Sequence, residues 1–323
     1  VLTTNTSSAM IWTNNVSLNT LNYSSLVGST ISTNSITINN LSLNETEIAL
    51  GLLAGSTLQN NCAVAIGANA GQSSQQQGAI SVGNYAGQIS QGSTAISIGI
   101  YAGQISQGSN SIAIGNNAGS GQSNSPQGSN AIAMGNYAGY RWQGINTVAI
   151  GNQAGLTYQS NDSVAIGFNA ANYSQGLTSV AIGNNAGKFI QENDCVAIGN
   201  NAGSSRQHFE SIAIGMNAAS TFQGGDSIAI GTCAGQYYQN AEAVAIGFST
   251  AMTSQNQWGI AIGSYAGWST QGTQSVAIGY CAGMNNQGSN CIAIGNKAGM
   301  NNQASESIVI NGSYATLENT STG

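Results

Sequence analysis

The chain has 323 residues, including 44 glycines and a single proline, and its formal net charge at pH 7 is −6. Charged residues make up 4% of the chain, whereas an ordinary soluble domain carries about 25%. This acidic balance argues against a nucleic-acid-binding protein, which would show a basic patch. No apolar run reaches the roughly 18 residues of a membrane-spanning helix, so we expect no membrane insertion.

Residues 1–47 form a first segment that is rich in Ser, Thr and Asn. Its part TISTNSITINNLSLN alternates polar and apolar residues, which is typical of β-structure. Two roles stay open for this segment: it caps the first coil of the repeats that follow, or it adds a strand to a neighbouring subunit. It also contains five of the chain's N-x-S/T sequons, which are candidate glycosylation sites: Asn5, Asn15, Asn22, Asn40 and Asn44.

Residues 48–315 are a repeat array, and residues 316–323 form a short C-terminal tail. Each repeat ends a short apolar block on glycine, from Gly51 to Gly295, and Asn311 holds the seventeenth place. Consecutive glycines are 16 residues apart, except for a step of 20 residues between Gly115 and Gly135. We expect these four extra residues, which lie close to Pro126, to bulge out as a loop without breaking the array.

The apolar block predicts a short strand in every repeat. Val or Ile stands three residues before the glycine, a large apolar residue stands one before it, and Ala or Ser lies between them, with Val309 as the exception. This alternation places large side chains on one face of the strand and small ones on the other. The glycine itself permits a corner, where φ is often positive.

A glutamine column accompanies the strands. Gln follows the block glycine by eight residues in the regular copies, and Gln127 keeps the same distance to its next block. If coils stack about 4.8 Å apart, equivalent amides can bond to one another along the stack. We therefore predict a structural glutamine ladder of Gln59, Gln75, Gln91, Gln107, Gln127, Gln143, Gln159, Gln175, Gln191, Gln207, Gln223, Gln239, Gln255, Gln271, Gln287 and Gln303.

Together these columns predict an all-β fold: a parallel β-solenoid, or β-roll, of about 17 coils of 16 residues. One coil cannot bury its own apolar edge, but stacked coils form a continuous core. Helical repeats are excluded because the block is too rich in Gly, Asn and β-branched residues.

The blocks SVAIGNNAG at Ser179–Gly187 and SIAIGNNAG at Ser111–Gly119 resemble the head repeats of YadA-like trimeric autotransporter adhesins. Similar arrays occur in fibre and tail-fibre-like proteins of large DNA viruses and phages. The resemblance covers residues 48–315 and implies a left-handed roll, three chains side by side, and an adhesive or fibrous role. The period of 16 is longer than the period of about 14 in that head, and no coiled-coil stalk is evident, which favours a fibre subunit.

Acidic residues occupy one column, five residues before the block glycine. Carboxylates stacked on neighbouring coils suggest a cation-binding edge, with Ca²⁺ as the ion that best suits oxygen ligands. The alternative is a solvated corner, since Asn110, Asn130, Asn146 and Asn290 share the column. The residues of this cation edge are Asp162, Asp194, Glu210, Asp226 and Glu242.

Aromatic residues gather five to seven residues after the block glycine. A regular scaffold with one variable, aromatic face is typical of a contact surface, although local packing over a corner is the alternative. The contact face comprises Tyr140, Arg141, Trp142, Tyr158, Phe189, Phe222, Tyr238 and Trp268. Its partner would be a sister chain, a neighbouring subunit, or a host receptor or glycan.

The sequence offers no catalytic constellation, so we expect no enzyme activity and no resident cofactor. His208 is the only histidine, and neither GxxxxGK nor a helix-opening GxGxxG is present. The five cysteines lack metal-ligand spacing; Cys233 and Cys281 share a column but lie three coils apart, about 14 Å, which is too far for a disulfide.

These observations favour a structural subunit of an extracellular, cell-surface or virion-surface fibre, filament or spike. It would associate with copies of itself through the N-terminal segment and the solenoid ends, as a trimer or as a head-to-tail filament. A host-binding adhesin head is the first alternative. An ice-binding solenoid is the second, although no column is consistently Thr.

Overall fold

The computed structural model describes residues 3–4, 10–11, 47–121 and 125–313. The chain divides into two units, residues 1–43 and residues 44–323. In the first unit, β1 (Thr3–Thr4) pairs with β2 (Met10–Ile11) in an antiparallel arrangement. The rest of the predicted N-terminal segment, except Glu47, lies outside the described residues, as do residues 316–323 of the predicted tail.

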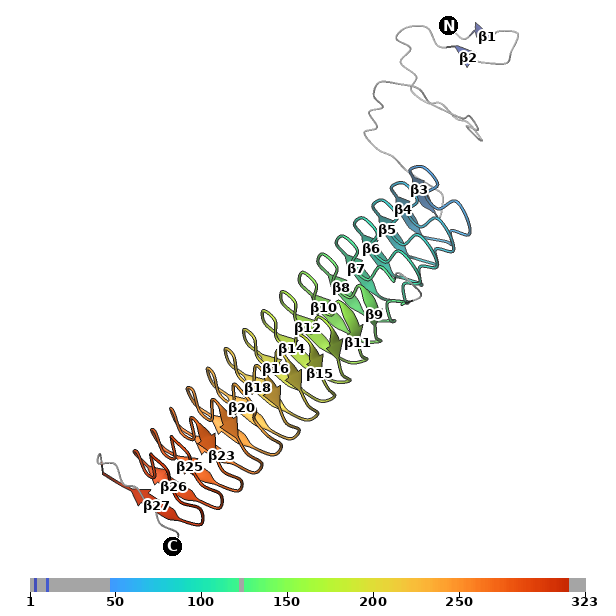
Figure 1. The fold of residues 1–323 in the computed structure, drawn as a ribbon. Helices are drawn as coiled ribbons and strands as arrows, with labels where there is room; N and C mark the ends of the chain where they lie inside the picture. Colours follow the sequence, from blue (N-terminus) through green and yellow to red (C-terminus); the bar gives the residue numbers. More distant parts are fainter. Residues whose placement is uncertain (1–2, 5–9, 12–46, 122–124, 314–323) are drawn as a thin grey trace. The chain divides into compact units, whose positions relative to one another are not determined.

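The second unit is a β-solenoid of about sixteen turns, whose coils follow one another along its length (Figure 1). One strand from each apolar block joins a main sheet, and these strands pair in parallel and in sequence order. The main sheet consists of β3 (Ile48–Leu50), β4 (Val64–Ile66), β5 (Ile80–Val82), β6 (Ile96–Ile98), β7 (Ile112–Ile114), β8 (Ile132–Met134), β10 (Val148–Ile150), β12 (Val164–Ile166), β14 (Val180–Ile182), β16 (Val196–Ile198), β18 (Ile212–Ile214), β20 (Ile228–Ile230), β21 (Val244–Ile246), β23 (Ile260–Ile262), β25 (Val276–Ile278), β26 (Ile292–Gly295) and β27 (Ile308–Asn311).

The register of this sheet follows the 16-residue period. Val164 pairs with Val180, and Ala165 pairs with Ala181. Hydrogen bonds between coils continue around the corners; for example, Asn169 N donates to Asn152 O at 3.0 Å. The predicted all-β parallel solenoid is therefore confirmed, whereas the left-handed sense implied by the resemblance stays a prediction. The described residues contain no helix that could cross a membrane.

A second, narrower face forms where each coil reaches its glutamine. Its strands are short because only two or three residues of each coil adopt extended geometry. They are β9 (Arg141–Gln143), β11 (Thr157–Gln159), β13 (Ser174–Gln175), β15 (Ile190–Gln191), β17 (Arg206–Gln207), β19 (Phe222–Gln223), β22 (Ser254–Gln255) and β24 (Thr270–Gln271). Isolated parallel bridges, such as Gln107 to Gln127, extend this second face over further coils.

The interior between the two faces is lined by alanine methyl groups. The middle residue of nearly every main-sheet strand points inward, and Ala165, Ala197 and Ala229 are fully buried. The alanine that follows the first corner is buried as well, as at Ala154 and Ala186. The small side chains of the strand therefore face inward, and the large Val and Ile side chains face outward.

The block glycines are required because neighbouring coils approach closely at this corner. Gly167 has φ of +130°, and a Cβ atom there would lie 2.5 Å from the carbonyl oxygen of Gly183. Such a contact is sterically impossible, and an L-residue would also be strained at this φ. Asn311 ends the last described strand, with no further block after it in the sequence.

The four-residue insertion leaves the stack continuous. β7 pairs with β8 across it, with Ile112 opposite Ile132. On the second face, Gln107 bridges to Gln127. The stack therefore continues across the insertion, as predicted, whereas the predicted bulge falls in part on residues 122–124, which lie outside the described part of the chain.

Candidate binding surfaces

The predicted glutamine column lies inside the solenoid, where its amides link the two faces. Gln207 is fully buried, and its Nε2 donates to the carbonyl oxygens of Val196 at 2.9 Å and Ser211 at 3.0 Å. The first acceptor belongs to the main-sheet strand of the same coil, and the second lies in the approach to the next strand. These bonds supply partners for carbonyl groups that would be costly to bury alone.

Bonds between successive glutamines run along much of the column. Gln175 Nε2 donates to Gln191 Oε1 at 3.1 Å, and Gln191 Nε2 donates to Gln207 Oε1 at 3.1 Å. This series of amide-to-amide bonds is interrupted in places. For example, Gln175 Oε1 is buried and accepts no hydrogen bond from the described residues. The column is thus primarily a brace between the two faces, with amide-to-amide bonds as a second contribution.

The outer face of the main sheet is an apolar stripe that we call the Val/Ile face. It comprises the residues three and one before each block glycine. The residue at the position three before the glycine is half-buried in every coil except the last. Several residues at the position one before the glycine are exposed, including Ile98 at 41% and Ile182 at 36%. Parallel sheets are normally covered on both faces. Here one face covers the interior, and the described residues provide nothing over the other.

The predicted cation edge is a row of exposed carboxylates that mostly accept hydrogen bonds from neighbouring coils. Asn146 Nδ2 donates to Asp162 Oδ1 at 2.9 Å, and Thr178 Oγ1 donates to Asp194 Oδ1. Glu242 accepts from the indole Nε1 of Trp258 at 2.8 Å. Among the described residues, no group of three or more His, Cys, Asp or Glu side chains is placed to hold a metal ion. This bonding fits the solvated corner, and calcium binding stays an untested prediction.

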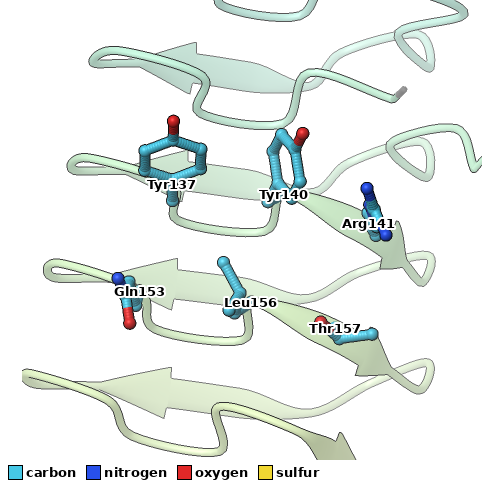
Figure 2. Close-up of a pocket in the computed structure, with 6 residues that line it drawn as sticks. All are labelled: Tyr137, Tyr140, Arg141, Gln153, Leu156 and Thr157. Carbon is cyan, nitrogen blue, oxygen red and sulfur yellow. The ribbon is translucent and has the colours of Figure 1, made fainter.

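The predicted contact face includes one aromatic hollow of about 330 Å³, which we call hollow 1. Tyr137 and Tyr140 meet edge to face there, with ring centroids 5.1 Å apart. The guanidinium carbon of Arg141 lies 5.1 Å from the Tyr140 ring centroid, which is within cation–π distance. In Figure 2 these three residues stand on one coil, and Gln153, Leu156 and Thr157 stand below them on the next coil.

A second hollow of about 360 Å³, hollow 2, lies further along the same side of the coils. It is lined by Phe189, Ile190, Ser205, Arg206, Thr221, Phe222 and Tyr238. Phe222 and Tyr238 come from adjacent coils, and their ring centroids are 6.5 Å apart. The strands β15, β17 and β19 supply Ile190, Arg206 and Phe222.

The structure brings most of the predicted contact residues together, but not all of them. Trp142 and Tyr158 stack with centroids 6.0 Å apart, whereas Trp268 is half-buried and lines neither hollow. Tyr137, Gln153 and Arg206 also line the hollows, although the sequence pattern did not predict them as contact residues. Tyr137 and Gln153 belong to the column two residues after the glycine, and the corner brings Tyr137 against Tyr140 of the same coil. The five predicted glycosylation sites lie outside the described residues.

Comparisons with known proteins place the chain in no family. No family model matches it, and neither a curated protein nor a solved structure matches it significantly.

Proposed function

We propose that this chain is a structural subunit of an extracellular fibre or spike, and that copies of it pack side by side through the Val/Ile face. The proposal gives the chain a structural rather than a catalytic role. One observation carries it: an apolar stripe two residues wide runs along the main sheet, and no described residue covers it.

The size of the stripe supports an interface with another copy. Sixteen coil steps of about 4.8 Å give a stripe about 80 Å long. Monomeric soluble proteins rarely expose contiguous apolar patches larger than a few hundred Å². Because this stripe repeats along the chain in register, another copy of the same chain presents a surface of matching period.

The direction of the stripe favours a bundle of parallel rods. A stripe that runs along the solenoid axis brings coil against coil, and a rotation axis parallel to the solenoid closes such an assembly. Association through the solenoid ends would instead use the edges of β3 and β27, where Ile308 is 62% exposed and Ile310 is 68% exposed. Those edges could extend a bundle into a filament.

Sedimentation equilibrium of the full chain tests the proposal. The triple variant Ile182→Thr, Ile230→Thr and Ile262→Thr removes apolar area from the Val/Ile face and keeps β-branched residues in the strands. A matched triple, Ile89→Thr, Ile145→Thr and Ile190→Thr, changes residues of similar exposure that lie outside this face.

We expect the wild-type chain and the matched triple to be oligomeric at micromolar concentration, and the Val/Ile-face triple to dissociate at least tenfold more readily. A monomeric wild-type chain, or equal dissociation of the two triples, would overturn the proposal.

A further inference from the structure

The two arginines of the chain each line an aromatic hollow on the second face. Arg141 belongs to hollow 1, with Tyr137 and Tyr140, and Arg206 belongs to hollow 2, with Phe189 and Phe222. The chain has only four cationic Lys and Arg residues in all. A scaffold that uses charge so rarely, yet places both arginines beside aromatic rings, indicates a ligand-binding role for this face.

Neither arginine is neutralised within the described chain. The one ion pair among the described residues joins His208 to Glu192, and none of the residues that line either hollow is acidic. Both side chains are exposed. A guanidinium in this setting can form two parallel hydrogen bonds with a carboxylate or sulfate group.

The rest of each lining suits a hydroxyl-rich ligand with an apolar ring face. In hollow 1, Gln153 and Thr157 supply an amide and a hydroxyl from the next coil, on either side of Leu156 (Figure 2). In hollow 2, Ser205 and Thr221 accompany Phe222. Aromatic rings can cover the C–H face of a sugar, while amide and hydroxyl groups bond to its hydroxyls. Both hollows are shallow depressions along a rod, which suits a chain-like ligand.

We propose that the second face binds an anionic glycan, with Arg141 and Arg206 contacting its acidic groups and the aromatic rings contacting its sugar rings. The two arginines are four coils apart, or about 19 Å at the coil spacing. A glycan long enough to span them engages both hollows at once, so its affinity exceeds that of a fragment confined to one hollow. An extended acidic peptide fits less well, because the backbone of the second face already pairs from coil to coil and offers no free strand edge there.

Binding of defined probes to the full chain at 0.15 M salt tests this proposal. The probes are a heparin-derived oligosaccharide, which is sulfated, an oligogalacturonate, which is carboxylated, neutral dextran, and poly-glutamate. The double variant Arg141→Ser and Arg206→Ser uses a residue that the chain already has at equivalent positions, Ser205 and Ser174. Lys297→Asn removes a positive charge away from both hollows and serves as the charge control.

We expect at least one of the two anionic glycans to bind, with the sulfated and carboxylated probes distinguishing which acidic group is preferred. Each arginine lost lowers affinity by about tenfold or more, because hydrogen bonds to charged groups are among the stronger ones. Lys297→Asn leaves affinity within twofold. Tyr140→Ser, which keeps every charge, weakens glycan binding as well.

Three results would overturn the proposal. They are no binding of either anionic glycan, equal loss in the double arginine variant and in Lys297→Asn, and binding of poly-glutamate as tight as that of the glycans.

Discussion

Gln239 Nε2 donates a hydrogen bond to the carbonyl oxygen of Ile228 at 2.8 Å, across the interior of one coil. The same amide nitrogen lies 3.2 Å from Ala243 O, in the approach to the next strand, and 3.1 Å from Gln255 Oε1, one coil further on. One buried side chain thus joins the second face to the main sheet and one coil to the next. Repeated along the column, this arrangement holds the narrow solenoid together.

Replacing Gln239 by Glu should destabilise the solenoid in a pH-dependent way. At neutral pH a buried carboxylate would face the carbonyl oxygen of Ile228, and an uncompensated buried charge costs about 3–5 kcal/mol. Because burial raises the pKa of such a carboxyl, its neutral form is favoured as pH falls, so the loss should shrink between pH 7 and pH 5. Thermal unfolding followed by circular dichroism measures this difference.

The matched control is Gln236→Glu, at a half-buried surface position of the same coil. It should change the melting temperature little at either pH. A Gln239→Glu variant that melts like this control at pH 7 would show that the glutamine column does not brace the coils.

Gly167→Ala should separate two coils. The new Cβ atom would lie 2.5 Å from Gly183 O, at a φ of +130° that alanine rarely adopts. We expect a loss of about 2 kcal/mol or more in the free energy of unfolding, since strain and a backbone clash act together. Urea denaturation measures the loss, and Gly312→Ala is the control because no atom lies within 4 Å of its added Cβ. Equal midpoints for the two variants would contradict this account of the corner.

Ala229→Leu tests which strand face is inside. Ala229 is fully buried, so three added carbon atoms should overpack the interior and cost about 1–3 kcal/mol. Thr232→Leu adds an apolar side chain to the same coil at a half-buried outer position and should cost less than about 0.5 kcal/mol. If thermal melts show both variants to be equally stable, the small side chains do not line the core.

The cysteines should differ in reactivity. Cys62 is exposed, whereas Cys195 is buried and its Sγ donates to His208 O at 2.9 Å. Burial raises the pKa of the Cys195 thiol, which lowers its thiolate fraction near neutral pH. A thiol reagent such as DTNB should therefore modify Cys62 in the native chain and Cys195 only after denaturation. Modification of Cys195 at the rate of Cys62 would contradict its placement.

The raised pKa of the Cys195 thiol also predicts how the stability of the fold changes with pH. An exposed or unfolded cysteine titrates near 8.5, and the folded Cys195 thiol titrates higher. Its contribution to stability is therefore complete below about pH 8.5 and is lost as pH rises towards the folded pKa. Cys195→Ser should remove this part of the alkaline destabilisation, as pH-dependent melts would measure.

The stacking of the coils could be predicted from the sequence because period and chemistry agree. A glycine every 16 residues, such as Gly151 and Gly167, and a Gln at a fixed distance from it have meaning only if coils lie in register. Which face of the strand points into the solenoid could not be predicted in this way. The Val-Ala-Ile alternation defines two faces, but it does not say which is inside.

The small side chains point inward because the interior is narrow and is already occupied by the glutamine side chains. A Cβ atom on Gly155 would lie 2.7 Å from Gln159 Oε1 and 3.3 Å from the Ala149 methyl group. The glutamine side chain that reaches across leaves room for a methyl group and not for isoleucine. The larger side chains therefore point outward and form the Val/Ile face.

The aromatic hollows were predictable only in part. The variable columns after the glycine predicted Tyr140 and Arg141 as contact residues, and both line hollow 1. That Tyr137 and Gln153 join them depends on how the corner folds back and on which coil lies next to it. The spacing of one repeat contains neither the fold of the corner nor the neighbouring coil, so the complete lining follows only from the three-dimensional structure.

A cryo-electron microscopy reconstruction of the assembled protein tests the central claim most directly. We predict parallel solenoids whose Val/Ile faces meet, with Ile182 and Ile230 of one copy packed against the same face of another. A reconstruction in which this face is open to solvent, or in which isolated single solenoids predominate at micromolar concentration, would contradict the account.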